Sequence, residues 1–344
     1  MKWMRKGRRM GSRAVCLLVC ALLFSVWPAH WAAASEPRML VPVGHTIGIK
    51  LFSDGVLVVG LAEVESSSGM SAPGAECGLK VGDVIEEANG TEVESSAQFS
   101  ALLQCGGTVE LAVNRGGEEL TLAARPVEDE DGTYRLGAWI RDSMAGIGTI
   151  TFYDPQTGQF GALGHGVTDG DTGILMPLLD GAVMASRVKA VKMGSAGSPG
   201  QLRGEFDLTR DMGVLSANTQ RGVFGTIEKS EMTDGRAIPV ASFDEVHEGK
   251  AMIYANVSGD SVEEYEIEIL KVLDPTGAQN LLLRVTDREL IAKTGGIVQG
   301  MSGSPIIQDG KLVGAVTHVL VNDPTKGYGI FIENMLDACR VSRR

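Results

Sequence analysis

The chain of 344 residues carries 43 acidic and 31 basic side chains, and its formal net charge is −12 at pH 7. This length allows two compact domains, while the acidic balance excludes the broad basic surface that nucleic-acid binding needs. Glycine is frequent, at 45 residues, and aromatic residues make up only 5% of the chain. Together with short valine- and isoleucine-rich runs, this composition predicts a mainly β protein with many turns.

The N-terminal segment has the order of an export signal. Six basic residues precede the first acidic one, and they are followed by the apolar run "AVCLLVCALLFSVW" and the small residues of "PAHWAAASE". We expect residues 1–34 to be either a cleaved signal peptide or a membrane anchor, because the apolar part counted on to Ala34 reaches the roughly 20 residues that a spanning helix needs. The rest of the chain is then expected on the outer face of the cytoplasmic membrane.

Metal ligands have no recognisable spacing in this sequence. Neither Cys-x-x-Cys nor His-Glu-x-x-His occurs, and two of the five cysteines, Cys16 and Cys20, lie in the N-terminal segment. We therefore expect no metal and no other cofactor.

Residues 40–127 are expected to form the first domain. Two pairs of strands, in "TIGIKLFSDGVLVVGLAEV" and "GTVELAVNRGGEELTLAARPV", flank a central segment in which "EANGTEV" supplies the Asn-Gly turn of a hairpin. Short helices are expected at Ala75–Leu79 and at Ser96–Gln104, where Phe99, Leu102 and Leu103 share one face.

The central segment "AECGLKVGDVIEEANGTEV" resembles the PDZ family. This resemblance implies that the domain captures a peptide by strand addition, with backbone amides of the loop before the second strand holding the bound segment. That loop is "PVGHTIGI", and the positions implied are Gly44, His45, Thr46, Ile47 and Gly48. The alternatives are that His45 is an ordinary loop histidine and that the domain is a spacer.

Residues 130–344 are expected to form a second domain built around "IVQGMSGSPIIQDGKLVGAVTHV". Gly, Ser and Pro between apolar runs predict a sharp turn that presents Ser302. A nucleophilic serine needs a base, a group that orients the base, and donors for the oxyanion. Outside the N-terminal segment and the first domain, the possible bases are His165, His247 and His318. We favour His165 in "GALGHGVTD", and expect His247 to be a solvated turn residue and His318 a wall of the site.

The turn "GMSGSP" with the following "IIQDGKLVGAVTH" resembles the nucleophile turn of chymotrypsin-like serine proteases. The resemblance implies a fold of two antiparallel β-barrels, with Ser302 as nucleophile and the backbone N–H groups of Gly300 and Ser302 as oxyanion donors. It also implies that Thr317 lies on the strand that pairs with the substrate backbone.

The order of signal, PDZ domain, "GALGHGVTD" and "TGGIVQGMSGSPIIQDGKLVGAVTHVLVNDPTKGYGIFIENML" resembles the stage IV B sporulation peptidase family of endospore-forming bacteria over nearly the whole chain. The family implies a signalling serine endopeptidase that works between the two membranes of a developing spore. Its implied substrate is an extracytoplasmic part of a membrane-bound intramembrane-protease complex, whose activation releases a sigma factor.

The family pattern implies Asp287, in "LLLRVTDREL", as the acid of the triad. Its position departs from the general chymotrypsin-like plan, so Asp207, Asp211 and Asp169 stay rivals, and the alternative for Asp287 is a helix-start carboxylate. We favour Asp287, because an apolar strand that ends in Asp can hold a buried orienting carboxylate. Two other functions stay open: an inactive PDZ scaffold, and a quality-control protease for misfolded envelope proteins.

Overall fold

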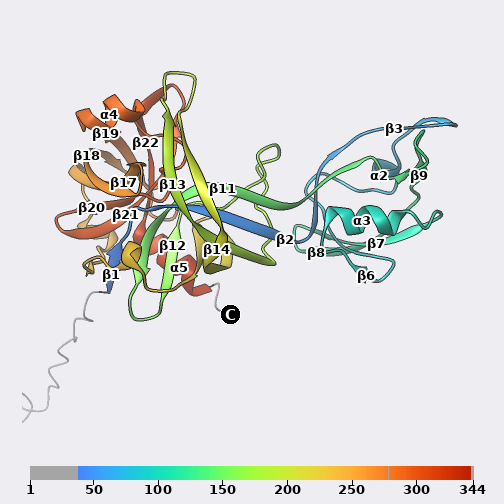
Figure 1. The fold of residues 1–344 in the computed structure, drawn as a ribbon, viewed down its shortest axis with the longest axis horizontal. Coiled ribbons are helices and arrows are strands. Elements are labelled where there is room, and N and C mark those ends of the chain that lie inside the picture. The colour runs from blue at the N-terminus through green and yellow to red at the C-terminus, as the bar shows by residue number, and fades with distance from the viewer. Residues whose placement is uncertain (1–37, 278, 342–344) are drawn as a thin grey trace, which may run out of the picture. The chain divides into compact units, whose positions relative to one another are not determined.

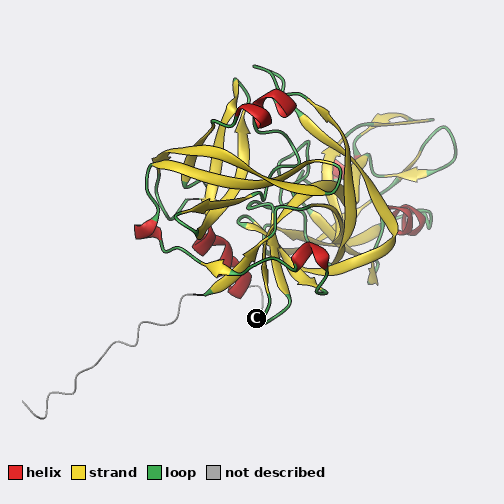
Figure 2. Cartoon of the chain, turned by 60° about the vertical axis from the view of Figure 1, so that its left-hand side comes forward, coloured by secondary structure: helices red, strands yellow, loops and turns green. Residues whose placement is uncertain are grey.

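The structure is a computed structural model that describes residues 38–277 and 279–341. The signal or anchor predicted for residues 1–34 lies outside these ranges. Strands predominate over helices throughout the described chain (Figure 2). No helix in the described ranges is both long enough and apolar enough to cross a membrane.

The first barrel is a ring of six strands, joined in the order β11–β12–β15–β14–β13–β2 and closed by pairing of β2 with β11. All of these pairs are antiparallel. Alternate residues of the strands, among them Ile47, Ile49, Ile150 and Val183, fill its interior. The strands are β2 (Thr46–Leu61), β11 (Ala138–Asp154), β12 (Gln159–Ala162), β13 (Asp180–Lys192), β14 (Gln201–Thr219) and β15 (Gly222–Ile227), with β1 (Met39–Pro42) and β16 (Ile238–Pro239) extending the sheet beside β11.

The second barrel is drawn in orange and red in Figure 1 and also has six strands. Tyr265, Ile253 and Leu283 are buried in its core. Its presence beside the first ring confirms the predicted double β-barrel. The elements are β17 (Gly249–Ser258), β18 (Ser261–Val272), β19 (Leu281–Val285), β20 (Pro305–Gln308), β21 (Lys311–Leu320), β22 (Asp323–Phe331), and the helices α4 (Arg288–Thr294) and α5 (Ile332–Val341).

The chain leaves the first barrel along β2 and returns to it along β11, and residues 54–140 between these points form what we call the PDZ module (Figure 1). It has its own apolar core around Val58, Ile85, Phe99 and Leu111. Besides the ends of β2 and β11, its elements are β3 (Val64–Ser66), β4 (Gly69–Ser71), α2 (Pro73–Glu76), β5 (Val84–Ala88), β6 (Thr91–Glu92), α3 (Ser96–Leu103), β7 (Val109–Arg115), β8 (Glu118–Ala124), β9 (Val127–Glu128) and β10 (Tyr134–Arg135).

Local signals in the PDZ module act as the sequence predicts. Ser95 caps α3 by accepting a hydrogen bond from the Gln98 N–H at 3.2 Å. Asn89 and Gly90 both have positive φ, +53° and +71°, as the hairpin turn requires. The first helix begins earlier than predicted, at Pro73, because proline suits the first helical position.

The sequence predicted a PDZ domain at residues 40–127 and a peptidase domain at residues 130–344. In the structure, residues 40–52 belong to the first barrel rather than to the PDZ module. These residues pair within the first barrel: the early part of β2 has β11 on one edge and β13 on the other. The PDZ module therefore interrupts the first barrel between two of its strands. A linear division missed this because β2 and β11 are each long enough to serve both structures.

Candidate active site

Ser302 lies in a tight turn between α4 and β20. The Met301 N–H closes the turn on the Val298 carbonyl at 3.1 Å. Gly303 has a φ of +99°, and a Cβ there would lie 2.0 Å from the Thr149 carbonyl oxygen. Only glycine allows such a close approach, so the contact of this turn with the first barrel requires the glycine that follows Ser302.

The Ser302 hydroxyl donates a hydrogen bond to the Thr317 carbonyl at 2.6 Å. The register of β21 with β22 shifts between Val316 and His318, so Thr317 lies at a bulge. A bulged residue drops out of the regular ladder, which leaves its carbonyl available to the serine. In this structure the hydroxyl is thus held by a wall of the site rather than by a histidine.

His165 follows β12, and its Nδ1 lies 2.8 Å from the Gly166 carbonyl oxygen. A carbonyl can only accept, so Nδ1 carries the proton and Nε2 is the basic nitrogen, which is the form a general base needs. Burial lowers the pKa of His165 below its usual value, and the Gly166 hydrogen bond only partly opposes this effect. The imidazole is therefore neutral and able to accept a proton near pH 7.

His318 faces His165, with 5.0 Å between the ring centroids and a tilt of 38° between the rings. Burial, with a smaller contribution from His165, lowers the pKa of His318. Two neighbouring imidazoles that are both neutral avoid the repulsion of two cations. The structure thus places His318 where the sequence predicted it, as a wall beside the candidate base.

Ser302, His165, Thr317 and His318 line one pocket of about 430 Å³. Among its described lining residues, none is Asp, Glu, Lys or Arg. An uncharged wall of this kind favours apolar or neutral side chains. The apolar lining comes from both barrels and includes Ile49, Met144, Ile147, Val298, Val319 and Val321.

Gly300 and Ser302 both line this pocket, and their backbone N–H groups are the expected oxyanion donors. In the described part of the chain, neither has a hydrogen-bond acceptor within the protein. The Gly300 carbonyl, by contrast, accepts a hydrogen bond from the Thr149 hydroxyl at 2.7 Å. Unpaired N–H groups beside a serine are available to stabilise an oxyanion, and this role of the two residues stays a prediction.

Asp287 is not joined to His165 in this structure. Its Oδ1 accepts hydrogen bonds from the N–H groups of Glu289 and Leu290, at 2.9 and 3.0 Å, as the N-cap of α4. This position fits the alternative that the sequence left open, a helix-start carboxylate. The nitrogen of His165 that a triad acid would hold is bonded to Gly166 instead.

The rival carboxylates also have other partners. Asp207 and Asp211 are exposed on β14, and Asp207 accepts hydrogen bonds from Thr209. Asp169 is fully buried; its Oδ1 accepts from Thr172, and its Oδ2 lies 2.8 Å from Arg141 Nη1 of β11. Among the described residues, no hydrogen bond joins a carboxylate to His165.

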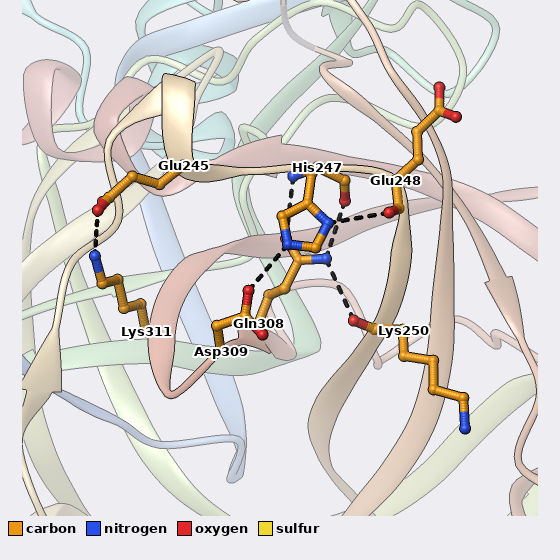
Figure 3. Close-up of polar contacts among 7 residues, drawn as sticks. All are labelled: Glu245, His247, Glu248, Lys250, Gln308, Asp309 and Lys311. Carbon is orange, nitrogen blue, oxygen red and sulfur yellow. Dashed lines mark hydrogen bonds and ion pairs between the residues drawn. The ribbon is translucent and has the colours of Figure 1, made fainter.

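His247 lies in the turn just before β17 of the second barrel and is not among the residues that line the pocket. Figure 3 shows its polar contacts. Its Nε2 is 2.9 Å from Asp309 Oδ2, and its Nδ1 is 3.0 Å from the Glu248 carbonyl. The Glu248 carbonyl and then Asp309 raise the pKa of His247. The side chain is 59% exposed, so His247 is the solvated turn residue that the sequence predicted.

Gly44, His45, Thr46, Ile47 and Gly48, predicted to hold a peptide at the PDZ domain, lie in the first barrel instead. The Gly44 N–H donates to the Ile150 carbonyl at 2.9 Å, and the His45 carbonyl accepts from the Ile150 N–H at 3.0 Å. Ile47 and Gly48 pair with β11 on one edge and β13 on the other. Because both edges are occupied, these residues cannot accept an added strand.

A groove of about 530 Å³ lies within the PDZ module, between α3 and the start of β11. Phe99 and Leu103 line it from the helix, and residues 136–140, which lead into the start of β11, also line it. Asp142 holds the helix against the strand by accepting a hydrogen bond from the Ser96 N–H at 2.8 Å. The sequence analysis missed this groove; the available signal was "LGAWI", a glycine between apolar residues just before a strand.

The fold and the site together define a chymotrypsin-like serine peptidase that carries a PDZ module. A family model described as SpoIVB peptidase S55 matches residues 132–336, and a PDZ-domain model matches residues 67–115. The chain belongs to the SpoIVB peptidase S55 family.

More distant similarity is confined to parts of the chain. A curated serine protease HTRA1 from Xenopus laevis is 36% identical over 58 residues, which are 17% of this chain and 13% of that protein. The solved PDZ domain of an SdrC-like protein from Listeria monocytogenes is 26% identical, with a TM-score of 0.21, over 25% of this chain and 87% of that one. The HtrA-type protease AlgW, solved with a decapeptide, is 13% identical, with a TM-score of 0.37, over 59% of this chain and 53% of that one.

Proposed function

We propose that this peptidase is a signalling enzyme of spore formation. It is exported, works between the membranes of the forespore, and cuts an extracytoplasmic part of a membrane-bound complex so that an intramembrane protease activates a sigma factor. The observation that carries the enzymatic part is one pocket lined by Ser302, His165 and Gly300, in which the N–H groups of Gly300 and Ser302 have no acceptor within the described residues. Membership of the family supports the signalling part.

Catalysis begins when the Ser302 hydroxyl leaves the Thr317 carbonyl and turns toward Nε2 of His165. Breaking the bond to Thr317 costs on the order of 1 kcal/mol, and the new bond to His165 offsets this cost. His165 then takes the hydroxyl proton as the oxygen attacks a peptide carbonyl, and it later gives the proton to the leaving amine. Water repeats the same steps on the acyl-enzyme and releases the acid product.

The developing oxyanion is stabilised by the N–H groups of Gly300 and Ser302, and losing one such donor costs roughly 3 kcal/mol of transition-state stabilisation. The Gly166 carbonyl keeps His165 in its basic tautomer. Asp287 stays the proposed triad acid of the family pattern, and its role requires it to leave the cap of α4 and to replace the Gly166 carbonyl at Nδ1 of His165. Thr317 is the proposed substrate-pairing residue, and its movement frees the serine at the same time.

The PDZ module is proposed to bind a peptide segment, and residues 1–34 to hold the enzyme at the membrane or to be cleaved. A groove lined by α3 and an edge strand supports peptide addition. An N-terminus set by self-cleavage would be absent from the Ser302→Ala protein, so sequencing the N-termini of both forms tests that step.

Labelling by a fluorophosphonate probe tests the enzymatic part. We expect the full-length protein to be labelled, and folded Ser302→Ala and His165→Ala variants not to be labelled. Absence of labelling in the folded wild type, with and without a peptide for the PDZ groove, would favour the inactive scaffold.

Substrate choice tests the signalling part. We expect wild type to leave unfolded casein intact and to cut one subunit of the membrane complex, with Ser302→Ala as the control. Rapid cleavage of casein at many sites would instead favour a quality-control protease.

A further inference from the structure

One strand, β11, lines both the PDZ groove and the catalytic pocket. Residues 138–140, at its beginning, contribute to the groove. Met144, Ala145, Gly146 and Ile147, a short way along the same strand, contribute to the pocket that holds Ser302. A polypeptide that follows β11 therefore passes from one site to the other.

The edge of β11 between these sites is open. Residues 138–149 pair with β2 on one side, and in the described chain no strand pairs with the other side before Ile150. The burial of the strand also changes near this point: no residue from Ala138 to Ile147 is buried, whereas every residue from Gly148 to Asp154 is buried. An unpaired edge of this kind is a template for an added strand.

The groove end of this edge is strongly acidic. Residues 54–140 contain 16 Asp and Glu but only four Lys and Arg. Two of those four cations, Arg115 and Arg135, are already paired with Asp83 and Asp129. Of the acidic residues that line the groove, Glu63, Glu65, Glu130 and Asp131 have no ion pair within the described chain.

Trp139 gives the groove an apolar contact as well. Its side chain is 68% exposed, although it is the largest side chain on this part of β11. A ring on an open edge can pack over the stem of a lysine or arginine and attract its charge. The groove thus combines unpaired carboxylates with an aromatic face, and both features favour a basic extended segment.

We propose that the carboxyl-terminal side of the substrate, beyond the cleaved bond, adds to the open edge of β11 and places basic side chains in the PDZ groove. The direction follows from strand polarity, because β11 runs from the groove toward the pocket. A chain added antiparallel, like every strand ladder of the two barrels, runs from the pocket toward the groove. From Gly146 to Ala138 the span is about eight residues, or roughly 26 Å. This inference rests on the proposed peptidase function.

Binding to the full-length Ser302→Ala protein tests the charge preference without cleavage. The probes are two fluorescein-labelled ten-residue peptides, one alternating valine with lysine and one alternating valine with glutamate. We expect the lysine peptide to bind at least about tenfold more tightly at low salt, since two ion pairs at the groove rim suffice for this. Fluorescence anisotropy gives both dissociation constants.

Charge reversal shows where the preference arises. The groove variant Glu63→Lys/Glu130→Lys should abolish it, whereas the matched control Glu118→Lys/Glu119→Lys, on β8 and outside the groove lining, should keep it. Equal binding of the two peptides by the starting protein would overturn the proposal. An equal loss of preference in both variants would also overturn it, because the total charge rather than the groove would then be responsible.

The direction is tested with wild-type enzyme and a cleavable core peptide selected from a peptide mixture. A valine-lysine extension on the carboxyl side of the core should lower KM about tenfold, and the same extension on the amino side should leave it within twofold. The groove variant should abolish the gain. An equal or larger gain from the amino-side extension would contradict the antiparallel path. If no core peptide is cleaved, the proposed function fails, while the binding experiment still decides the charge preference.

Discussion

Replacing Arg141 with methionine should destabilise the first barrel by about 3 kcal/mol. Asp169, its partner, is 0% exposed, and its Oδ2 has no hydrogen bond within the described residues, so the 2.8 Å ion pair with Arg141 is the main compensation of that oxygen. Removing one member of a buried ion pair costs about 3–5 kcal/mol. The lower end applies here because the Arg141 side chain is 34% exposed and its charge is partly solvated.

A double-mutant cycle separates the ion pair from other effects of the substitution. Urea unfolding followed by circular dichroism would give the free energy of unfolding for wild type, Arg141→Met, Asp169→Asn and the double variant. We expect the double variant to be more stable than Arg141→Met, since a neutral amide no longer leaves a charge buried. An interaction energy below about 0.5 kcal/mol would refute the reasoning, because distant, independent sites add to within that range.

The same pair gives stability a pH dependence. Burial raises the pKa of Asp169, but hydrogen bonds from Thr172 and Asp171 and the charge of Arg141 outweigh it, so the folded-state pKa lies below the ordinary 3.8. A depressed carboxyl pKa contributes stability above the unfolded value, and this contribution is lost as the pH falls through the folded value. Wild type should therefore lose more stability than the double variant below about pH 4.

Three further predictions concern the site. Asp287→Asn should keep wild-type stability, because Asn also caps helices, while Asp287→Ala should lose about 1 kcal/mol of stability. As the proposed triad acid, Asp287 should also be needed for catalysis, so folded Asp287→Asn should be labelled about a thousandfold more slowly than wild type; wild-type labelling of this variant would contradict the proposed role. The acid limb of kcat/KM for a fixed peptide should have a midpoint below pH 6.5, because burial keeps His165 neutral and only the neutral form accepts a proton; a midpoint above 6.5 would contradict this. Gly303→Ala should cost at least about 3 kcal/mol in urea unfolding, from left-handed strain and overlap with Thr149, whereas Gly310→Ala, at a φ of +76° in open space, should cost only about 1 kcal/mol; equal losses would show that the close approach is not what requires glycine.

Local patterns in the sequence were sufficient for much of the fold. Alternating apolar residues predicted strands, Asn89-Gly90 predicted a hairpin turn, and Ser95 and its neighbours predicted α3. Because the chain has few histidines and a glycine-rich turn that presents a serine, the sequence indicated His165 as candidate base and Ser302 as candidate nucleophile. Each of these inferences depends on the chemistry of a few neighbouring residues, which the sequence displays directly.

The sequence by itself thus determined a mainly β, PDZ-containing peptidase with Ser302 and His165 as candidate pair. Only the tertiary structure decided that β2 and β11 run through both the barrel and the PDZ module, that Thr317 holds the serine, and that Asp287 caps a helix. These features depend on which distant segments become neighbours. Strand pairing joins residues that are distant in the sequence, and a carboxylate accepts hydrogen bonds from whichever donors the fold places beside it. A local sequence pattern therefore predicts neither the strand partners nor the partners of the carboxylate.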